Sequence, residues 1–195
     1  MQIDDWSRQV ATDQSADRSA HSKVMTFQKV MTFQLEKNET DPKAEVYAQL
    51  AAQLRSLIEG ERDFIANAAN FASLLYHSLF AVNWAGFYLL KEGELVLGPF
   101  QGLPACLRIA IGKGVCGTAA EQRQTILVDN VHEFPGHIAC DSASNSEIVV
   151  PLIANEKLIG VLDLDSPLFA RFDDEDARGL NELAEIFVQG SSDLK

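Results

Sequence analysis

Three cysteines and the carboxylates that follow them are the residues of this chain that could do chemistry. Cys106, Cys116 and Cys140 have the spacing C-x9-C-x23-C. The carboxylates that stand out after them are Glu147, Asp163 and Asp165. Thiolates attack electrophiles and can be oxidised, and carboxylic acids can donate protons to a reacting group. The combination predicts thiol redox chemistry on a polar small molecule.

Two pairs of side chains are expected to share one face of a strand, because side chains alternate along a strand. Asp163 and Asp165 are two residues apart, and Trp84 and Tyr88 are four apart. Two like charges so close are costly unless they bind a cation or one of them takes up a proton. The alternatives are solvated carboxylates at a sheet edge and an ordinary aromatic core.

Helices and strands must position these residues. Apolar spacing predicts helices within residues 42–80, with a break at Gly60, a short helix over 115–121 and a final helix from Asp173. Residues 130–145 have the composition of a long polar loop. The predicted strands are 82–90, 95–100, 125–128, 147–153 and 158–165. This order predicts an α+β fold with an antiparallel sheet of five to six strands. Helices would pack on one face, and loops would cover a ligand pocket on the other.

The composition excludes several classes of partner. The chain has 195 residues and a formal net charge of -12 at pH 7, so nucleic acid and anionic membranes are unfavourable partners. No apolar run approaches the roughly 20 residues of a membrane-spanning helix. The first ten residues lack the apolar core of a secretory signal. We therefore expect a cytoplasmic protein, in which a structural disulfide framework is unusual.

Residues 1–40 and 41–195 are expected to differ in order. The first segment is rich in Ser, Asp, Gln and Lys, which predicts a poorly ordered extension. The hexapeptide KVMTFQ occurs twice in succession, at 23–28 and 29–34. This unit is too short for a solenoid repeat, so we assign it no structural role. Residues 41–195 are numerous enough to bury a core as one domain.

Several motifs in the second segment resemble those of GAF domains and, more closely, those of the free methionine-(R)-sulfoxide reductases, a family of small enzymes with the GAF fold. The motifs are VNWAGFYLL, GPFQG-x-PAC, GVCGTAA, PGHIACD-x-x-SNSEIVVPL and GVLDLDSP. The resemblance covers roughly residues 45–190. The cysteine triplet distinguishes it from a resemblance to GAF sensors in general.

This resemblance implies an oxidoreductase that reduces free L-methionine (R)-S-oxide to L-methionine. It implies that Cys140 is the attacking thiol and Cys106 its disulfide partner, while Cys116 is an alternative member of the relay or an inert buried thiol. It also places five side chains in the substrate pocket: Trp84, Tyr88, Glu147, Asp163 and Asp165. Ser144 and Ser146 could donate hydrogen bonds to a substrate carboxylate, although serines in loops are usually solvated.

Sulfoxide reduction by thiols requires residue types that this chain has. A thiolate attacks the sulfoxide sulfur while an acid protonates its oxygen. The resulting cysteine sulfenic acid condenses with a second thiol, and an external dithiol such as thioredoxin reduces the disulfide. The carboxylates could bind the ammonium group of the substrate and protonate its oxygen, and the aromatic pair suits a methyl-sulfur group.

We expect no cofactor and no metal. His137 and Cys140 have the spacing H-x2-C, to which Cys106 and Cys116 could add sulfur ligands, but zinc sites usually contain a tight C-x2-4-C pair that is absent here. Two other interpretations stay open: a non-catalytic GAF sensor of a small ligand, and a redox-responsive structural protein. A homodimer is compatible with each of them.

Overall fold

A computed structural model describes residues 40–137 and 142–191 of the chain. The helices are α1 (Lys43–Leu57), α2 (Phe64–Ser78), α3 (Gly114–Gln122) and α4 (Asp174–Gly190). The strands are β1 (Trp84–Lys91), β2 (Glu94–Gln101), β3 (Arg108–Ala110), β4 (Ile126–Val128), β5 (Ser146–Ala154) and β6 (Lys157–Ser166). A short 3-10 helix, η1 (Val131–Glu133), follows β4.

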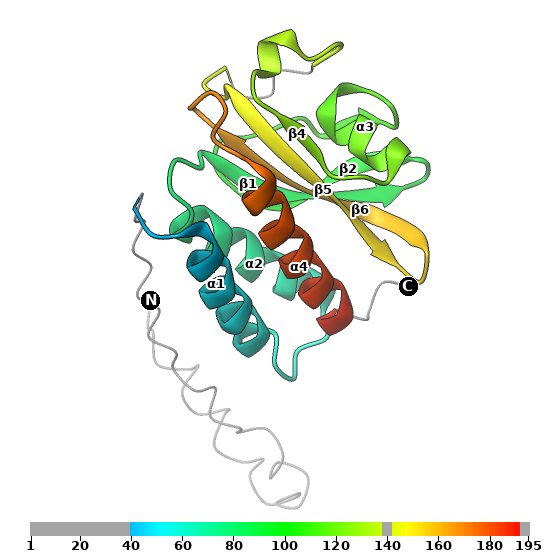
Figure 1. The fold of residues 1–195 in the computed structure, drawn as a ribbon. Helices are drawn as coiled ribbons and strands as arrows, with labels where there is room; N and C mark the ends of the chain where they lie inside the picture. Colours follow the sequence, from blue (N-terminus) through cyan, green and yellow to red (C-terminus); the bar gives the residue numbers. More distant parts are fainter. Residues whose placement is uncertain (1–39, 138–141, 192–195) are drawn as a thin grey trace, which may run out of the picture. The chain divides into compact units, whose positions relative to one another are not determined.

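The strands form one antiparallel sheet in the order β3-β2-β1-β6-β5-β4, so β1 and β6 lie at its centre (Figure 1). Trp84 of β1 pairs with Asp165 of β6, and Gly86 pairs with Asp163. On the other side of β6, Asp165 pairs with Glu147 of β5. The register therefore brings the predicted acids and one predicted aromatic residue to neighbouring positions, and the predicted α+β class is confirmed.

Helices α1, α2 and α4 cover one face of the sheet (Figure 1). Their packing centres on four buried phenylalanines, whose ring centroids lie 4.9 to 6.4 Å apart in the contacting pairs. These residues are Phe64, Phe71, Phe87 and Phe187. Because burial of one large apolar side chain stabilises a fold by about 1.5–3 kcal/mol, this cluster is a major source of stability.

The opposite face of the sheet carries α3 (Figure 1). Val115 and Ala119 of α3 belong to a second buried cluster with Val149 of β5 and Val161 of β6. The sequence predicts this helix over 115–121, within the connections expected to cover this face, and the structure shows that α3 covers it together with loops (Figure 1).

A buried ion-pair network holds the segment that follows β6. The carboxylate of Asp176 accepts hydrogen bonds from Tyr47 Oη (2.8 Å) and Arg171 Nη1 (3.2 Å), and it also pairs with Lys43. Arg171 donates a further bond from Nε to the carbonyl oxygen of Phe80 (2.9 Å). Because loss of one partner would leave a charge buried without compensation, this network holds α1, α4 and the segment that contains Arg171 together.

The predicted elements agree with the observed ones to within about two residues at most ends, but β3 and η1 have no predicted counterpart. Each has only three residues, which is too few for a periodic pattern. The predicted break at Gly60 is confirmed, since its backbone is left-handed (φ +79°). Asp63 caps α2 by accepting a hydrogen bond from the backbone N–H of Ala66.

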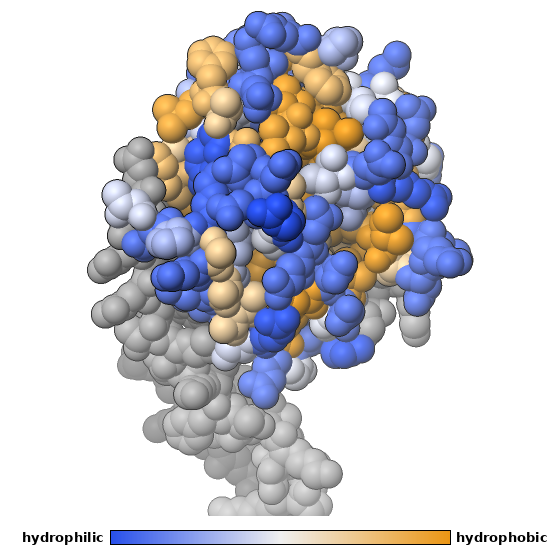
Figure 2. Space-filling view, in the orientation of Figure 1, coloured by the Kyte–Doolittle hydropathy of each residue, from blue (hydrophilic) through white to orange (hydrophobic). Residues whose placement is uncertain are grey.

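The prediction of a poorly ordered extension over residues 1–40 lies, except for Thr40, outside the described residues. Within the described ranges, the helices are too short or too polar to cross a membrane. In the space-filling view, hydrophilic side chains cover most of the visible face of the described part, and hydrophobic ones gather in smaller patches between them (Figure 2).

Candidate active site

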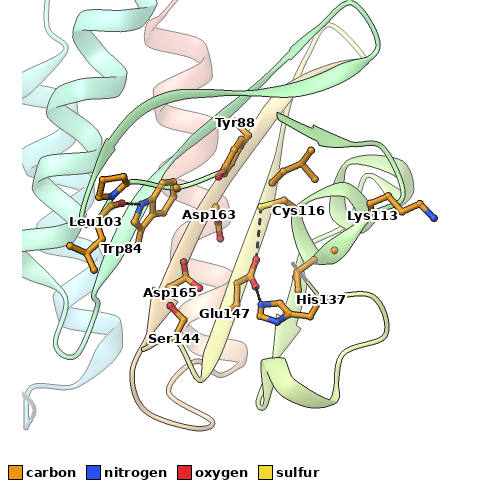
Figure 3. A pocket seen from close by; sticks show the side chains of 15 residues that line it. Trp84, Tyr88, Leu103, Lys113, Cys116, His137, Ser144, Glu147, Asp163 and Asp165 are labelled. Atoms are coloured by element: carbon orange, nitrogen blue, oxygen red, sulfur yellow. Dashed lines mark hydrogen bonds and ion pairs between the residues drawn. The ribbon is translucent and has the colours of Figure 1, made fainter. Parts of the chain in front are cut away.

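A pocket opens on the α3 face of the sheet, above the point where β1, β6 and β5 lie side by side (Figure 3). The loop 102–107 and the first turn of α3 form its other walls. The pocket brings together seven of the residues predicted from the sequence: Trp84, Tyr88, Cys116, Ser144, Glu147, Asp163 and Asp165. The shared face predicted for the two aspartates is confirmed, since Leu162 and Leu164 belong to the core on the helix side.

The acids of the pocket are largely removed from water. Glu147 and Asp163 are each only 6% exposed, whereas Asp165 is half-buried. Among the described residues, no lysine or arginine forms an ion pair with Glu147 or Asp163, and Asp163 Oδ1 has no hydrogen-bond partner. A buried oxygen of this kind is available to a ligand.

Burial changes the protonation of these acids. It raises the pKa of Asp163 from 3.8 to about 7, although hydrogen bonds with Cys116 and Glu147 oppose the change. The pKa of Glu147 is raised well above its usual range, first by burial and then by the charges of Asp163 and Asp165. Near neutral pH the pocket therefore holds a carboxylic acid proton, which is what a general acid requires.

Cys116 is a free thiol at the third position of α3. Its Sγ lies 3.9 Å from Glu147 Oε1 and donates a hydrogen bond to it (Figure 3). Helix N-termini usually lower the pKa of a thiol. Here burial raises the pKa of Cys116, and the charges of Asp163 and Glu147 raise it further. Cys116 therefore stays protonated and serves as a hydrogen-bond donor to the acids.

The structure describes only one of the other two cysteines. Cys106 is half-buried in the loop between β2 and β3 and takes part in a disulfide. Cys140 lies outside the described residues, so its predicted role as the nucleophile and its predicted pairing with Cys106 stay predictions.

The aromatic pair forms one wall of the pocket. The rings of Trp84 and Tyr88 stack with centroids 6.0 Å apart, and both side chains are buried. Trp84 Nε1 donates a hydrogen bond to the carbonyl oxygen of Leu103 (3.1 Å), which ties the wall to the loop that carries Cys106. Burial and the charge of Asp163 raise the pKa of Tyr88, so its phenol stays neutral.

Gly102 permits this arrangement of the tryptophan. Its backbone is left-handed (φ +129°), and a Cβ there would lie 2.6 Å from Trp84 Cδ1. The sequence contains this glycine within a motif, but nothing in the pattern predicts that it accommodates an indole ring.

The two predicted serines are separated by the sheet. Ser144 lines the pocket and its Oγ accepts a hydrogen bond from Asn83 Nδ2 (3.2 Å). Ser146 does not line the pocket, because it alternates with Glu147 along β5. Its hydroxyl donates to the carbonyl oxygen of Leu168 (2.7 Å) and accepts from the N–H of Arg171 (3.3 Å). Ser146 therefore holds the segment after β6 in place.

His137 lines the pocket, although the sequence indicated it only as a candidate metal ligand through its H-x2-C spacing to Cys140. Its Nε2 lies 3.9 Å from Glu147 Oε2 (Figure 3). Burial, with a smaller effect from His132, lowers the pKa of His137, so the ring is mostly neutral at pH 7. Its position three residues before Cys140 was the only signal in the sequence. Such a spacing is weak, because histidines in polar loops are often solvated and have no role in a site.

Comparison with known proteins relates this pocket to a family. A model of the GAF domain matches residues 73–189. The free methionine-R-sulfoxide reductase of Escherichia coli is 55% identical over 141 residues, which are 72% of this chain and 86% of that protein. The enzyme of the same name from Saccharomyces cerevisiae is 43% identical over 152 residues, 74% of this chain and 84% of its own.

A solved structure supports the same relationship. The free methionine-R-sulfoxide reductase of Neisseria meningitidis in complex with its substrate is 46% identical, with a TM-score of 0.75. The match covers 80% of this chain and 93% of that protein. The chain therefore belongs to the GAF-domain family and, within it, to the free methionine-R-sulfoxide reductases.

Proposed function

We propose that this protein reduces free L-methionine (R)-S-oxide to L-methionine, with disulfide formation between Cys106 and Cys140 and recycling by a thioredoxin-type dithiol of the cytoplasm. The observation that carries the proposal is a pocket in which protonated acids, an aromatic wall and a loop with a disulfide-bonded cysteine meet. The relatives named for this reaction support the choice of substrate.

The pocket suits a free amino acid. Glu147 and Asp165 would hold the ammonium group, and the protonated carboxyl of Asp163 would face the sulfoxide oxygen. The first turn of α3 faces the pocket, and a helix N-terminus favours a carboxylate. Trp84 and Tyr88 would contact the methyl-sulfur group. Methionine sulfoxide within a peptide lacks both free ends and would be excluded.

The reaction would proceed in two steps at sulfur. The thiolate of Cys140 attacks the sulfoxide sulfur while Asp163, kept protonated by its burial, donates a proton to the oxygen. In the adduct the hydroxyl group passes from the methionine sulfur to the cysteine sulfur. The S–O bond to methionine and the new S–S bond break, methionine leaves as the thioether, and Cys140 is left as a sulfenic acid. The thiol of Cys106 then attacks that sulfur, which forms the disulfide and releases water. The dithiol reductant supplies the two electrons that restore both thiols.

Cys116 would take no covalent part. Its protonated thiol donates to Glu147, which helps to keep the buried acids in position. This role agrees with its status as a free thiol while Cys106 is disulfide-bonded.

An assay of the reduced protein with a dithiol tests the proposal. We expect turnover of the free R sulfoxide, little turnover of the S epimer or of peptide-bound substrate, and loss of two thiols when sulfoxide is added without reductant. A protein that loses no thiols and binds the sulfoxide unchanged would be a sensor. A protein that loses thiols to peroxide but not to the sulfoxide would be a redox-responsive structural protein.

A further inference from the structure

Three buried groups in the pocket form a donor set that suits a metal ion. Ligand atoms of Cys116, Glu147 and Asp163 all lie within 4.8 Å of one another. They come from three elements, α3, β5 and β6, whose packing fixes their separation (Figure 3). This set differs from the one considered from the sequence, which joined His137 to the three cysteines.

A second observation points to a ligand at the same place. Asp163 Oδ1 is buried and has no hydrogen-bond partner among the described residues. Lys113, which also lines the pocket, is exposed and directs its amino group away from the acids (Figure 3). Burial of an unpaired polar oxygen costs free energy, and a cation bound at this oxygen would remove the cost.

We propose that this cluster binds a thiophilic divalent cation such as Zn²⁺, with Cys116, Glu147 and Asp163 as ligands, and that the bound ion inhibits the enzyme. One thiolate and two carboxylates are common zinc ligands, and a soft sulfur donor selects against Mg²⁺ and Ca²⁺. The thiol proton and the protons of the buried carboxyls pass to solvent when the metal binds. His137 lies beside Glu147 and can orient that carboxylate from outside the ligand set.

The inhibitory part rests on the proposed function. The cation would exclude the substrate ammonium group, because both need the carboxylate of Glu147. Bound metal would also keep the carboxyl of Asp163 from donating a proton. The ion is thus an inhibitor that competes with the amino acid and has no part in the reaction.

Titration of the disulfide form of the full chain with Cd²⁺ tests the site, because Cys106 is then unavailable and Cys116 is a free thiol. We expect one equivalent to bind with the ultraviolet absorption of a cadmium–thiolate bond. Cys116→Ser should abolish that absorption. Asp163→Asn and Glu147→Gln should each raise the dissociation constant at least about tenfold. Asp174→Asn, an exposed acid on α4, makes the same charge change and should leave binding intact.

Several outcomes would overturn the site. The wild-type protein could show no thiolate absorption, the absorption could survive in Cys116→Ser, or Asp163→Asn and Asp174→Asn could bind equally well. If Cys116→Ser fails to fold, the dissociation constants of Asp163→Asn and Glu147→Gln show whether the site exists. A final arm adds L-methionine, which should weaken Cd²⁺ binding. If the metal binds as described and methionine has no effect, the metal site stands and the proposed position of the ammonium group is wrong.

Discussion

The two faces of strand β6 differ in what they bury. Leu162 and Leu164 face the helices and join a core of aliphatic and aromatic side chains. Asp163 faces α3, where it is buried almost as completely but keeps an oxygen without a partner among the described residues. The helix face is an apolar core, whereas the α3 face adds to its own apolar cluster a set of buried acids whose removal from water costs free energy. Predictions for the two faces should separate stability from activity.

The cysteine variants should have the largest effect. Cys140→Ser should abolish turnover, because the nucleophile is lost. Cys106→Ser should release about one equivalent of methionine per protein and then stop, since the sulfenic acid lacks its resolving thiol. Rapid quenching with quantification of methionine measures both. As the matched control, Cys116→Ser should still form the disulfide on treatment with sulfoxide. Steady turnover by Cys106→Ser would contradict the resolving role.

Asp163→Asn should separate activity from stability. Loss of a general acid should lower kcat/KM by about 10²- to 10⁴-fold. The free energy of unfolding should not fall, because burial of the carboxyl costs free energy of folding and Asn has nearly the same shape without the charge. Steady-state kinetics and urea unfolding give the two values. Asp174→Asn serves as the control for charge. A large loss of stability with normal activity of the folded fraction would make Asp163 structural.

Phe187→Ala should lower the stability of the fold and leave the activity unchanged, which is the opposite of the outcome expected for Asp163→Asn. This residue lies on α4 and contacts three other phenylalanine rings on the helix face. Its removal should lower the free energy of unfolding by about 3–5 kcal/mol. The activity per folded molecule should stay near that of the wild type, because the ring lies on the far side of the sheet from the pocket. A loss of activity at temperatures where the variant is fully folded would mean that the two faces are coupled.

The smallest expected effect is a dependence of the free energy of unfolding on pH. The pKa of Asp163 is about 7 in the folded chain, against an ordinary value of 3.8. Between these values the folded state keeps a proton that the unfolded state has released, so stability falls as the pH rises through this window. Urea unfolding at several pH values should show the fall. Asp163→Asn should show a weaker dependence, and an equal dependence in both proteins would assign the effect to other groups.

The sequence predicts the sheet and its two faces well, because alternation along β6 and β5 is strong. Leu162 and Asp163 are neighbours whose directions follow from their positions alone. The same rule explains Ser146: it precedes Glu147 in β5 and therefore points to the helix side, as Ile148 does. Alternation along this strand therefore places Ser146 outside the pocket.

Other features depend on contacts between distant segments, which one sequence does not reveal. The approach of Cys116 to Glu147 depends on how α3 packs on β5. His137 enters the pocket through a loop with no periodic pattern. The match of Gly102 to the ring of Trp84 is a steric relation across the β1–β2 pair. These relations need the folded arrangement and could not be derived from spacing.

The register between β1 and β6 determines both the core and the position of the acids. A displacement of β6 by one residue would turn Asp163 and Asp165 toward the helices and bring Leu162 and Leu164 into the pocket. Such a molecule would lose both its hydrophobic core on the helix side and the acids of its pocket. A copy in the wrong register would therefore be both less stable and inactive, so the strand pairing that secures the core also secures the catalytic centre.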